Sequence, residues 1–222
     1  MNRLTRPMTA GLLAVAMMGA TGCLVKQTTH TIDLSPEGTV DWVVIEREVR
    51  SDEHDPAERA REEQDYLAAA RLGAHPVAEA FNLLGPTDVQ TLVYRDRRPF
   101  LVVTRARFAR LDWLGRRVLE RTGVPGESRL EAVPGGMKWT FVAGPEPPDD
   151  GTSEDEGGPL GALIEDVDAY RIVLTEGRFV DAVGFTIVDD GTGAVPEEAT
   201  SEDEGPEPDQ VVLSLTWTTA RN

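Results

Sequence analysis

Hydrophobic and polar residues alternate in short runs along most of this chain of 222 residues. In the run VVLSLTWT at 211–218, the hydrophobic residues fall on one face and the serine and threonines on the other. Gln27–Leu34 alternates in the same way, with His30, Ile32 and Leu34 on one face. A period of two residues is typical of a strand with one buried face, so both segments are predicted strands.

A second strand is predicted at Thr39–Arg50, after the turn SPEG, which has proline and glycine where a type I turn prefers them. Its hydrophobic positions change parity between the first half, which contains Trp42, and the second half, which contains Val49. Such a change indicates a β-bulge, or burial on both faces, near the middle of the strand.

Three segments have the period and the end signals of helices. The longest begins at Pro56 with Asp55 as its N-cap and Glu58 three residues after the cap, and it is expected to end at Leu72 before Gly73. Two shorter helices are predicted, from His75–Pro76 to about Leu84, and at Leu111–Thr122.

The remaining alternating segments predict further strands joined in hairpins, with a helical turn at Leu160–Asp168. These strands are Asp88–Arg95, Phe100–Phe108, Arg129–Val133, Met137–Ala143, Tyr170–Thr175 and Arg178–Val188. The sum is an α+β fold: an antiparallel sheet of about nine strands with about three helices packed on one face.

Two acidic segments interrupt this pattern, at 144–159 and 195–209. Each contains the hexapeptide TSEDEG, and together they hold thirteen acidic residues and no basic residue, which accounts for most of the net charge of −17. Both are rich in proline and glycine and poor in large apolar residues, so they cannot bury enough surface to offset chain entropy. We expect two acidic disordered loops within one domain. Weak cation binding and a partner-binding tract are the alternatives, although TSEDEG lacks the ligand spacing of a calcium loop.

The N-terminal segment has the organisation of a signal peptide. Arg3 and Arg6 precede an apolar run at Gly11–Ala20, which is shorter than the roughly 20 residues that a membrane-spanning helix needs. Small residues lead from this run to Cys23, the single cysteine of the chain. A lone cysteine in an exported protein has no intramolecular disulfide partner, and its place directly after the apolar run favours modification. An ordinary secretory signal with an unrelated cysteine is the alternative.

The tetrapeptide ATGC at 20–23 resembles the lipobox of bacterial lipoproteins, although Ala20 stands where leucine is usual. The resemblance implies that residues 1–22 are a signal peptide and that Cys23 carries acyl chains, palmitate among them. Leu24 follows the cysteine, where aspartate would imply inner-membrane retention. The resemblance therefore implies a lipid-anchored protein of the outer membrane that faces the periplasm.

Three further stretches, LSPEGTVDW, VLTEGRFVDAVGF and LSLTWT, resemble LppM-type bacterial lipoproteins. That resemblance implies an architecture alone: a hairpin after the lipobox, then helices, further strands and a closing strand. Residues 23–222 are accordingly expected to form a single α+β domain facing the periplasm.

Motifs that carry known chemistry are missing from the sequence. It has three histidines, no HExxH pair, no second cysteine for zinc, no GxSxG serine and no glycine-rich loop between a strand and a helix. The run SDEHDP at 51–56 groups three acids with His54, but it precedes a helix and is more typical of a cap than of a metal site. We therefore expect no catalysis, no cofactor and no metal.

Basic residues are concentrated between positions 95 and 121, where the sequence has nine arginines and three acidic residues. Arginine binds carboxylates and phosphates through a planar fork of donors. The candidate face for an anionic ligand comprises Arg95, Arg97, Arg98, Arg105, Arg107, Arg117 and Arg121.

Three interpretations of these arginines remain open. They form a solvated face that pairs with local acids, they bind anionic lipid or lipopolysaccharide phosphates beside the anchor, or they dock an acidic partner or the TSEDEG loops. Nucleic acid is disfavoured by the exported location and by the overall charge.

The sequence therefore predicts a membrane-anchored envelope lipoprotein with a non-catalytic structural, partner-binding or ligand-binding role. One alternative is a carrier that holds a lipid or other apolar molecule between the sheet and its helices, which requires an apolar cavity there. A second alternative is an envelope hydrolase whose active-site residues are dispersed in the sequence. The oligomeric state is not encoded in any pattern of the sequence.

Overall fold

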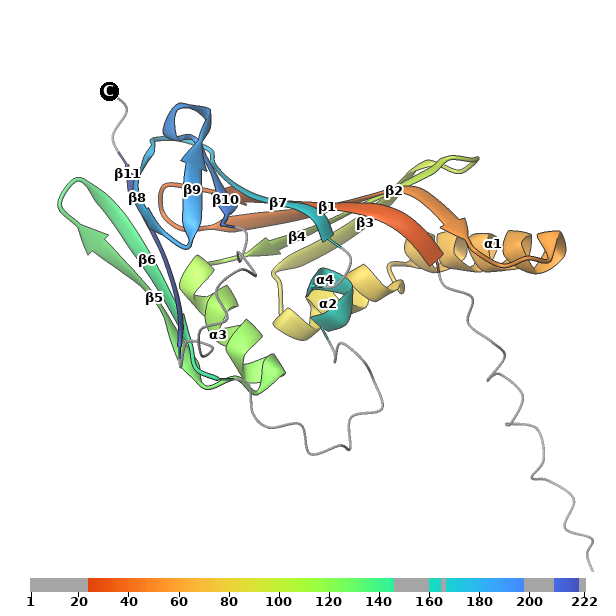
Figure 1. The fold of residues 1–222 in the computed structure, drawn as a ribbon, viewed down its shortest axis with the longest axis horizontal. Helices are drawn as coiled ribbons and strands as arrows, with labels where there is room; N and C mark the ends of the chain where they lie inside the picture. Colours follow the sequence, from red (N-terminus) through yellow and green to blue (C-terminus); the bar gives the residue numbers. More distant parts are fainter. Residues whose placement is uncertain (1–23, 146–159, 165–166, 198–209, 220–222) are drawn as a thin grey trace, which may run out of the picture.

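The structure is a computed structural model that describes residues 24–145, 160–164, 167–197 and 210–219 (Figure 1). Its strands are β1 (Leu24–Leu34), β2 (Val40–Ser51), β3 (Asp88–Arg95), β4 (Phe100–Phe108), β5 (Gly126–Val133), β6 (Gly136–Ala143), β7 (Val167–Leu174), β8 (Phe179–Val183), β9 (Phe185–Val188), β10 (Gly193–Pro196) and β11 (Val211–Thr218). The helices are α1 (Pro56–Leu72), α2 (Pro76–Leu84), α3 (Leu111–Thr122) and α4 (Gly161–Ile164), with a 3-10 turn at Asp189–Gly191. The α+β class is confirmed.

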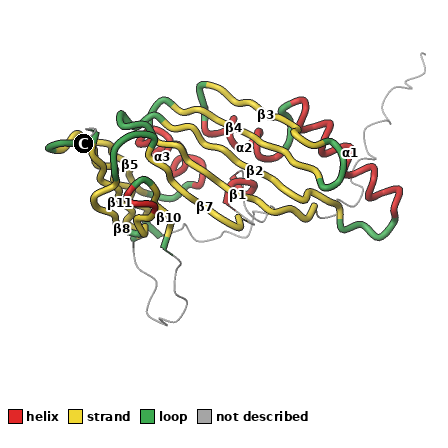
Figure 2. The backbone as a smooth tube through the Cα atoms, turned by 90° about the horizontal axis from the view of Figure 1, so that it is seen from above, coloured by secondary structure: helices red, strands yellow, loops and turns green. Residues whose placement is uncertain are grey.

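The described strands form two sheets, where the sequence predicted one. The larger sheet has seven strands in the order β3-β4-β2-β1-β7-β10-β9, and the smaller has four in the order β5-β6-β11-β8. Figure 2 shows β3, β4, β2, β1 and β7 side by side, with the smaller sheet at one end of the larger. In Figure 1, α1, α2 and α4 lie along one face of the larger sheet, and α3 lies between that face and the smaller sheet.

One strand pair departs from the expected antiparallel arrangement. β1 and β7 are parallel, with His30 opposite Tyr170, while the other strand pairs that the structure describes are antiparallel. Parallel neighbours need a long connection. Here more than a hundred residues, from β2 to α4, separate the two strands.

The change of parity in β2 is a β-bulge, as one of the two sequence interpretations proposed. The register of β2 with β4 shifts between Arg47 and Val49, and Glu48 between them has a φ of 54°. The extra residue moves Val49 onto the buried face that Trp42 and Glu46 occupy earlier in the strand. The bulge lies nearer the end of the strand than predicted.

Local signals gave α1 its predicted bounds. The side chain of Asp55 accepts the backbone N–H groups of Ala57 and Glu58 at 2.7 and 3.1 Å, and Gly73 ends the helix with a φ of 66°. The bounds of α3, β3 and β4 also match the prediction. No helix among the described residues combines the length and the apolar character that a bilayer crossing requires.

The predicted elements differ most from the structure in the segment after β7. The predicted strand at 178–188 is two strands, β8 and β9, which belong to different sheets. The predicted acidic loop at 195–209 is also too long, because Val195 and Pro196 belong to β10 and pair with Thr186 and Phe185 of β9. Both TSEDEG hexapeptides and Cys23 lie outside the described residues.

Buried apolar residues form two clusters along the inner face of the larger sheet. The larger cluster fills the space between the two sheets, α2 and α3, and the smaller lies under α1 around Leu67 and Phe100. Glu46 of β2 and Thr104 of β4, both with no exposed surface, lie between the two clusters along their strands. A polar layer therefore divides the core, and the larger cluster contains the candidate site.

Candidate functional site

A cavity of about 480 Å³ lies within the larger apolar cluster, between the two sheets. Its walls come from β1, β2 and β7 on one side, β6 and β11 on the other, and α2, α3 and the α4 segment between them. The lining comprises Ile32, Trp42, Leu84, Leu111, Leu114, Gly115, Val118, Trp139, Phe141, Leu160, Leu163, Val167, Tyr170, Ile172, Gly184, Phe185, Pro196 and Leu213. Small-molecule sites occupy roughly 300–1,000 Å³ and are mostly apolar, so both the size and the lining fit such a site.

Helix α3 contributes one continuous stripe to this lining. Leu111, Leu114, Gly115 and Val118 follow the i, i+3, i+4, i+7 spacing that places residues on one helical face. The sequence predicted this helix. It gave no indication that the face borders an unfilled space, because that depends on what lies opposite.

Gly115 allows α3 to approach the smaller sheet closely. A Cβ at this position would lie 2.3 Å from Oγ of Ser128 and 3.2 Å from Cδ2 of Phe141. That same Ser128 hydroxyl accepts the indole N–H of Trp139 at 3.0 Å, in a buried hydrogen bond. The glycine and the serine together fix the orientation of the Trp139 ring in the cavity wall.

Aromatic rings form two further parts of the wall. Trp42 and Tyr170 meet edge to face with centroids 6.0 Å apart, and Trp139 lies 6.5 Å from Phe185. Such pairs are more favourable than their buried area alone implies. Burial raises the pKa of Tyr170, so its phenol is protonated and uncharged at neutral pH.

His30 lies beside this aromatic wall, on the buried face of β1. The imidazole has no exposed surface, its Nδ1 accepts the indole N–H of Trp42 at 3.2 Å, and its centroid is 5.5 Å from that of Tyr170. Nε2 has no hydrogen-bond partner among the described residues. Burial lowers the pKa of His30 from 6.5 to about 4, so the ring is neutral at physiological pH. The sequence placed His30 on the buried face of a strand but did not select it as a site residue.

Glu46 is the centre of the polar layer next to this region. Its carboxylate accepts hydrogen bonds from Lys26 at 2.5 Å and from Tyr66 at 2.7 Å, and Nε2 of His75 lies 3.6 Å away. Burial alone would raise the pKa of Glu46, but these three partners outweigh burial and hold it at about 2. The layer therefore contains a buried carboxylate with several partners, which joins β1, β2, α1 and the start of α2.

The group Thr104, His75 and Glu46 does not have the geometry of a hydrolase triad. In such a triad the nucleophile and the carboxylate bind opposite nitrogens of the imidazole. Here the Thr104 hydroxyl, at 2.9 Å, and the Glu46 carboxylate both approach Nε2 of His75. All three residues are fully buried. This arrangement fits a structural role in joining α2 to the sheet.

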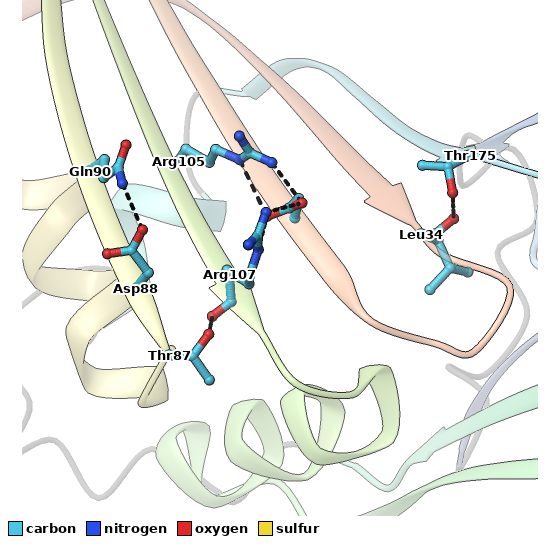
Figure 3. Close-up of polar contacts among 8 residues, drawn as sticks. Leu34, Thr87, Asp88, Gln90, Arg105, Arg107 and Thr175 are labelled. Carbon is cyan, nitrogen blue, oxygen red and sulfur yellow. Dashed lines mark hydrogen bonds and ion pairs between the residues drawn. The ribbon is translucent and has the colours of Figure 1, made fainter.

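The candidate arginines fall into three separate groups. Arg105 and Arg107 project side by side from β4 (Figure 3). Both pair with the carboxylate of Asp41 on β2, at 2.7 and 2.9 Å. Although partial burial acts to raise the pKa of Asp41, hydrogen bonds from Arg107 and Arg105 lower it overall. These two cations are therefore paired locally, as the first interpretation of the arginines expects.

The other two groups lie at the β3–β4 hairpin and on α3. Arg98 forms two hydrogen bonds to the buried Glu63, while Arg95 and Arg97 are exposed and have no ion pair within the described part of the chain. On α3, Arg117 pairs with Glu120 at 2.8 Å, and Arg121 donates to the carbonyl of Leu83 at 3.0 Å. The structure does not bring the seven arginines onto one face. Their role in binding an anionic ligand stays a prediction.

Comparisons with known proteins do not identify a family for this chain. No protein-family model matches the chain, and no curated protein matches it. Among solved structures, the chain is similar to the NMR structure of the folded domain of the Mycobacterium tuberculosis LppM protein, with a TM-score of 0.39 and 11% sequence identity. The similarity covers 94% of this chain and 97% of that one. This structural resemblance is weak.

Proposed function

We propose that the protein binds a small apolar molecule, such as the acyl chain of a lipid, in the cavity between its two sheets, and carries it without chemical conversion. The observation that supports this proposal is the cavity lining. None of its eighteen described residues is charged, and residues from seven strands and three helices converge on one space. The carrier hypothesis expected an apolar cavity between a sheet and its helices, and this cavity is bordered by a second sheet as well.

Magnitudes favour occupation by an apolar molecule. Apolar surface gains roughly 25 cal/mol per Å² when it contacts a ligand instead of water. Water is held poorly where polar partners are few. Each buried methylene of a ligand contributes about 0.8 kcal/mol.

We further propose that the protein works while anchored in the outer membrane through acylated Cys23, facing the periplasm. The sequence pattern at 20–23 supports the anchor, and β1 begins at Leu24, the next residue. An anchor one residue before β1 would hold the folded domain near a bilayer, which is a source of acyl chains. Stable anchoring needs more than one acyl chain, because a single chain binds only marginally.

Binding of a neutral fluorescent probe tests the proposal. The chain from Leu24 to Asn222, which keeps every described residue, would be titrated with N-phenyl-1-naphthylamine, and native mass spectrometry would give the stoichiometry. We expect one probe per chain with a dissociation constant in the micromolar range. Protein purified from a membrane-containing lysate should also retain a mass of lipid size.

A matched pair of variants locates the binding site. Val118→Trp places an indole in the cavity, whereas Glu120→Trp places the same indole on the exposed face of the same helix. The first should weaken probe binding at least tenfold, and the second should leave it unchanged. Equal affinities for the two variants, or no binding by the unaltered protein, would exclude the cavity as the site.

A further inference from the structure

Four strands of the larger sheet end side by side next to the first described residue. Leu24 at the start of β1 is opposite Ser51 at the end of β2, and the last part of β2 is opposite Phe100 at the start of β4. The turn between β3 and β4 lies at the same end of the sheet, beside α1 in Figure 1. Cys23 precedes Leu24 in the sequence, and consecutive Cα atoms are about 3.8 Å apart. An acyl anchor on Cys23 would therefore begin at this end of the sheet.

The outer face of the larger sheet, which is the face opposite the helices, presents arginines at this end. Arg47 of β2 is opposite Leu101 of β4, and Leu101 is opposite Arg95 of β3, so the three side chains form one row across the outer face. Arg50 follows on β2 after the bulge, and Arg97 lies in the β3–β4 turn. These anchor-end arginines, Arg47, Arg50, Arg95 and Arg97, are all exposed. None of the four has an ion pair within the part of the chain that the structure describes.

The local charge at this end is positive, although the whole chain has a net charge of −17. Within the described residues of the four strands and of the β3–β4 turn, Glu48 and Asp96 are the exposed acids at this end. At the other end of the same face, Asp41 binds both Arg105 and Arg107. Charges more than about 8 Å apart are largely screened at physiological salt. The four anchor-end arginines therefore determine which charge this end attracts.

Exposed apolar side chains accompany the anchor-end arginines. Val25, Leu92 and Tyr94 are 43%, 53% and 65% exposed. Val25 is opposite Arg50 on the outer face, and Leu92 is opposite Val103 on the same face. Tyrosine combines an apolar ring with a polar hydroxyl and is enriched where a membrane meets water. A bilayer offers phosphates and hydrocarbon together, whereas an acidic peptide would leave the apolar side chains without partners.

We propose that the anchor-end arginines bind the phosphates of anionic lipids in the bilayer that holds the anchor, with Tyr94 at the level of the headgroups. The inference rests on the proposed anchor and adds a second contact with the same membrane. Each basic residue near an anionic surface strengthens binding roughly fivefold. Four such residues give a dissociation constant on the order of 1 mM in lipid, which is too weak to retain the protein without acyl chains. The arginines therefore orient a protein that the anchor holds.

Vesicle sedimentation tests the inference on the chain from Leu24 to Asn222, which lacks Cys23 and so binds without an anchor. Vesicles of equal parts phosphatidylglycerol and phosphatidylcholine would be compared with vesicles of phosphatidylcholine alone, at millimolar lipid and physiological salt. We expect the protein to sediment with the anionic vesicles and to stay in solution with the neutral ones. Equal binding to the two kinds of vesicle, or binding to neither, would overturn the inference. The cavity and the acylation of Cys23 would remain open to their own tests, because probe titration and palmitate labelling need no anionic vesicles.

Two pairs of substitutions identify the arginines that bind. Arg95→Gln with Arg97→Gln should weaken binding to anionic vesicles about 25-fold. Arg105→Gln with Arg107→Gln removes the same charge from the same sheet, but the strand advances about 13 Å from Leu101 to Arg105. That exceeds the screening length, so this control should change binding less than about twofold. Equal losses in the two pairs would mean that net charge drives binding, and the inference would fail. Unfolding midpoints confirm that each variant folds.

The arginines of β2 provide an independent second variant. Arg47→Gln with Arg50→Gln should weaken binding to anionic vesicles by about the same factor, because both side chains lie on the surface that carries Arg95. Unchanged binding would contradict a single lipid-binding surface across the strand ends.

A second copy of the chain is the other occupant of this face that an experiment must recognise. Sedimentation velocity without vesicles gives the mass of the protein in solution. A mass that stays the same in Arg95→Gln with Arg97→Gln supports the lipid surface. A dimer that this pair of substitutions dissociates would assign the face to self-association and overturn the inference.

Discussion

Val183 and Phe185 are two residues apart in the chain but belong to different sheets. Val183 ends β8 and pairs with Ser214 of β11, whereas Phe185 begins β9 and pairs with Pro196 of β10. The residue between them, Gly184, has a φ of 74° and lines the cavity. This corner connects the two sheets between which the cavity lies.

Gly184→Ala should destabilise the protein for two reasons. A positive φ costs a residue with a Cβ about 1–2 kcal/mol, and the added Cβ would lie 2.4 Å from Cδ2 of Leu213. Gly135→Ala is the matched control, because Gly135 has a φ of 80° with no atom near its Cβ position. Urea denaturation should show a loss of about 1–2 kcal/mol for the control and roughly 1–3 kcal/mol more for Gly184→Ala. Equal losses would mean that Leu213 moves aside freely.

Gly115→Ala should affect both stability and the cavity wall. Its Cβ would displace Ser128 and break the hydrogen bond from Trp139. Overpacking of this kind costs about 1–3 kcal/mol. The fluorescence of Trp139 and the affinity for N-phenyl-1-naphthylamine should change together. Gly123→Ala, where nothing lies near the added Cβ, should leave both the fluorescence and the affinity unchanged.

Glu46→Gln should be strongly destabilising. The substitution removes the charge that pairs with Lys26 in a buried site. Removal of one partner of a buried pair costs about 3–5 kcal/mol. Glu120→Gln, which breaks an exposed pair with Arg117, should cost less than about 1 kcal/mol. Chemical denaturation of both variants measures the difference, and similar values for the two would show that the Glu46 cluster contributes little.

Stability should fall as the pH is lowered from 6.5 to about 4, because of His30. The unfolded imidazole binds a proton near pH 6.5, but the folded one binds it only near pH 4. In this interval the unfolded state holds more protons, so acid favours unfolding by about 3 kcal/mol in total. Glu46, with its pKa lowered from 4.5 to about 2, adds a further loss below pH 4.5.

The His30→Gln variant isolates the first of these two effects. Its stability should be nearly level between pH 6.5 and 4.5, while His54→Gln, at an exposed position, should follow the unaltered protein. Denaturation midpoints across this range give the test. A steep slope in His30→Gln would assign the pH dependence to other groups.

Cys23→Ser should release the protein from membranes and abolish incorporation of labelled palmitate. The expected cause is the loss of the acyl chains that the lipobox resemblance implies. Fractionation of bacterial cells that produce either form makes the comparison. If the serine variant remained with the membrane fraction, another part of the chain would have to hold it there.

Elements whose signals are local could be predicted from the amino-acid sequence. Asp55 and Pro56 start α1, and Gly73 ends it. The start signal and the end signal each act on backbone groups within a few residues. The bounds of β3, β4 and α3 follow from periodicity and turn residues in the same way. The buried face of β1, including His30, was also evident from alternation alone.

Features that depend on contacts between distant segments could not be predicted in this way. Alternation through 178–188 is continuous, and only the pairing of β8 with β11 and of β9 with β10 divides it at Gly184. The short strand β10 exists because β7 and β9 lie on either side of it. The cavity is the space between surfaces that belong to separate elements. Nε2 of His30 has no hydrogen-bond partner among the described residues because no polar group of a neighbouring element reaches it. Neither property belongs to a segment of sequence, because both arise from contacts between residues far apart in the chain.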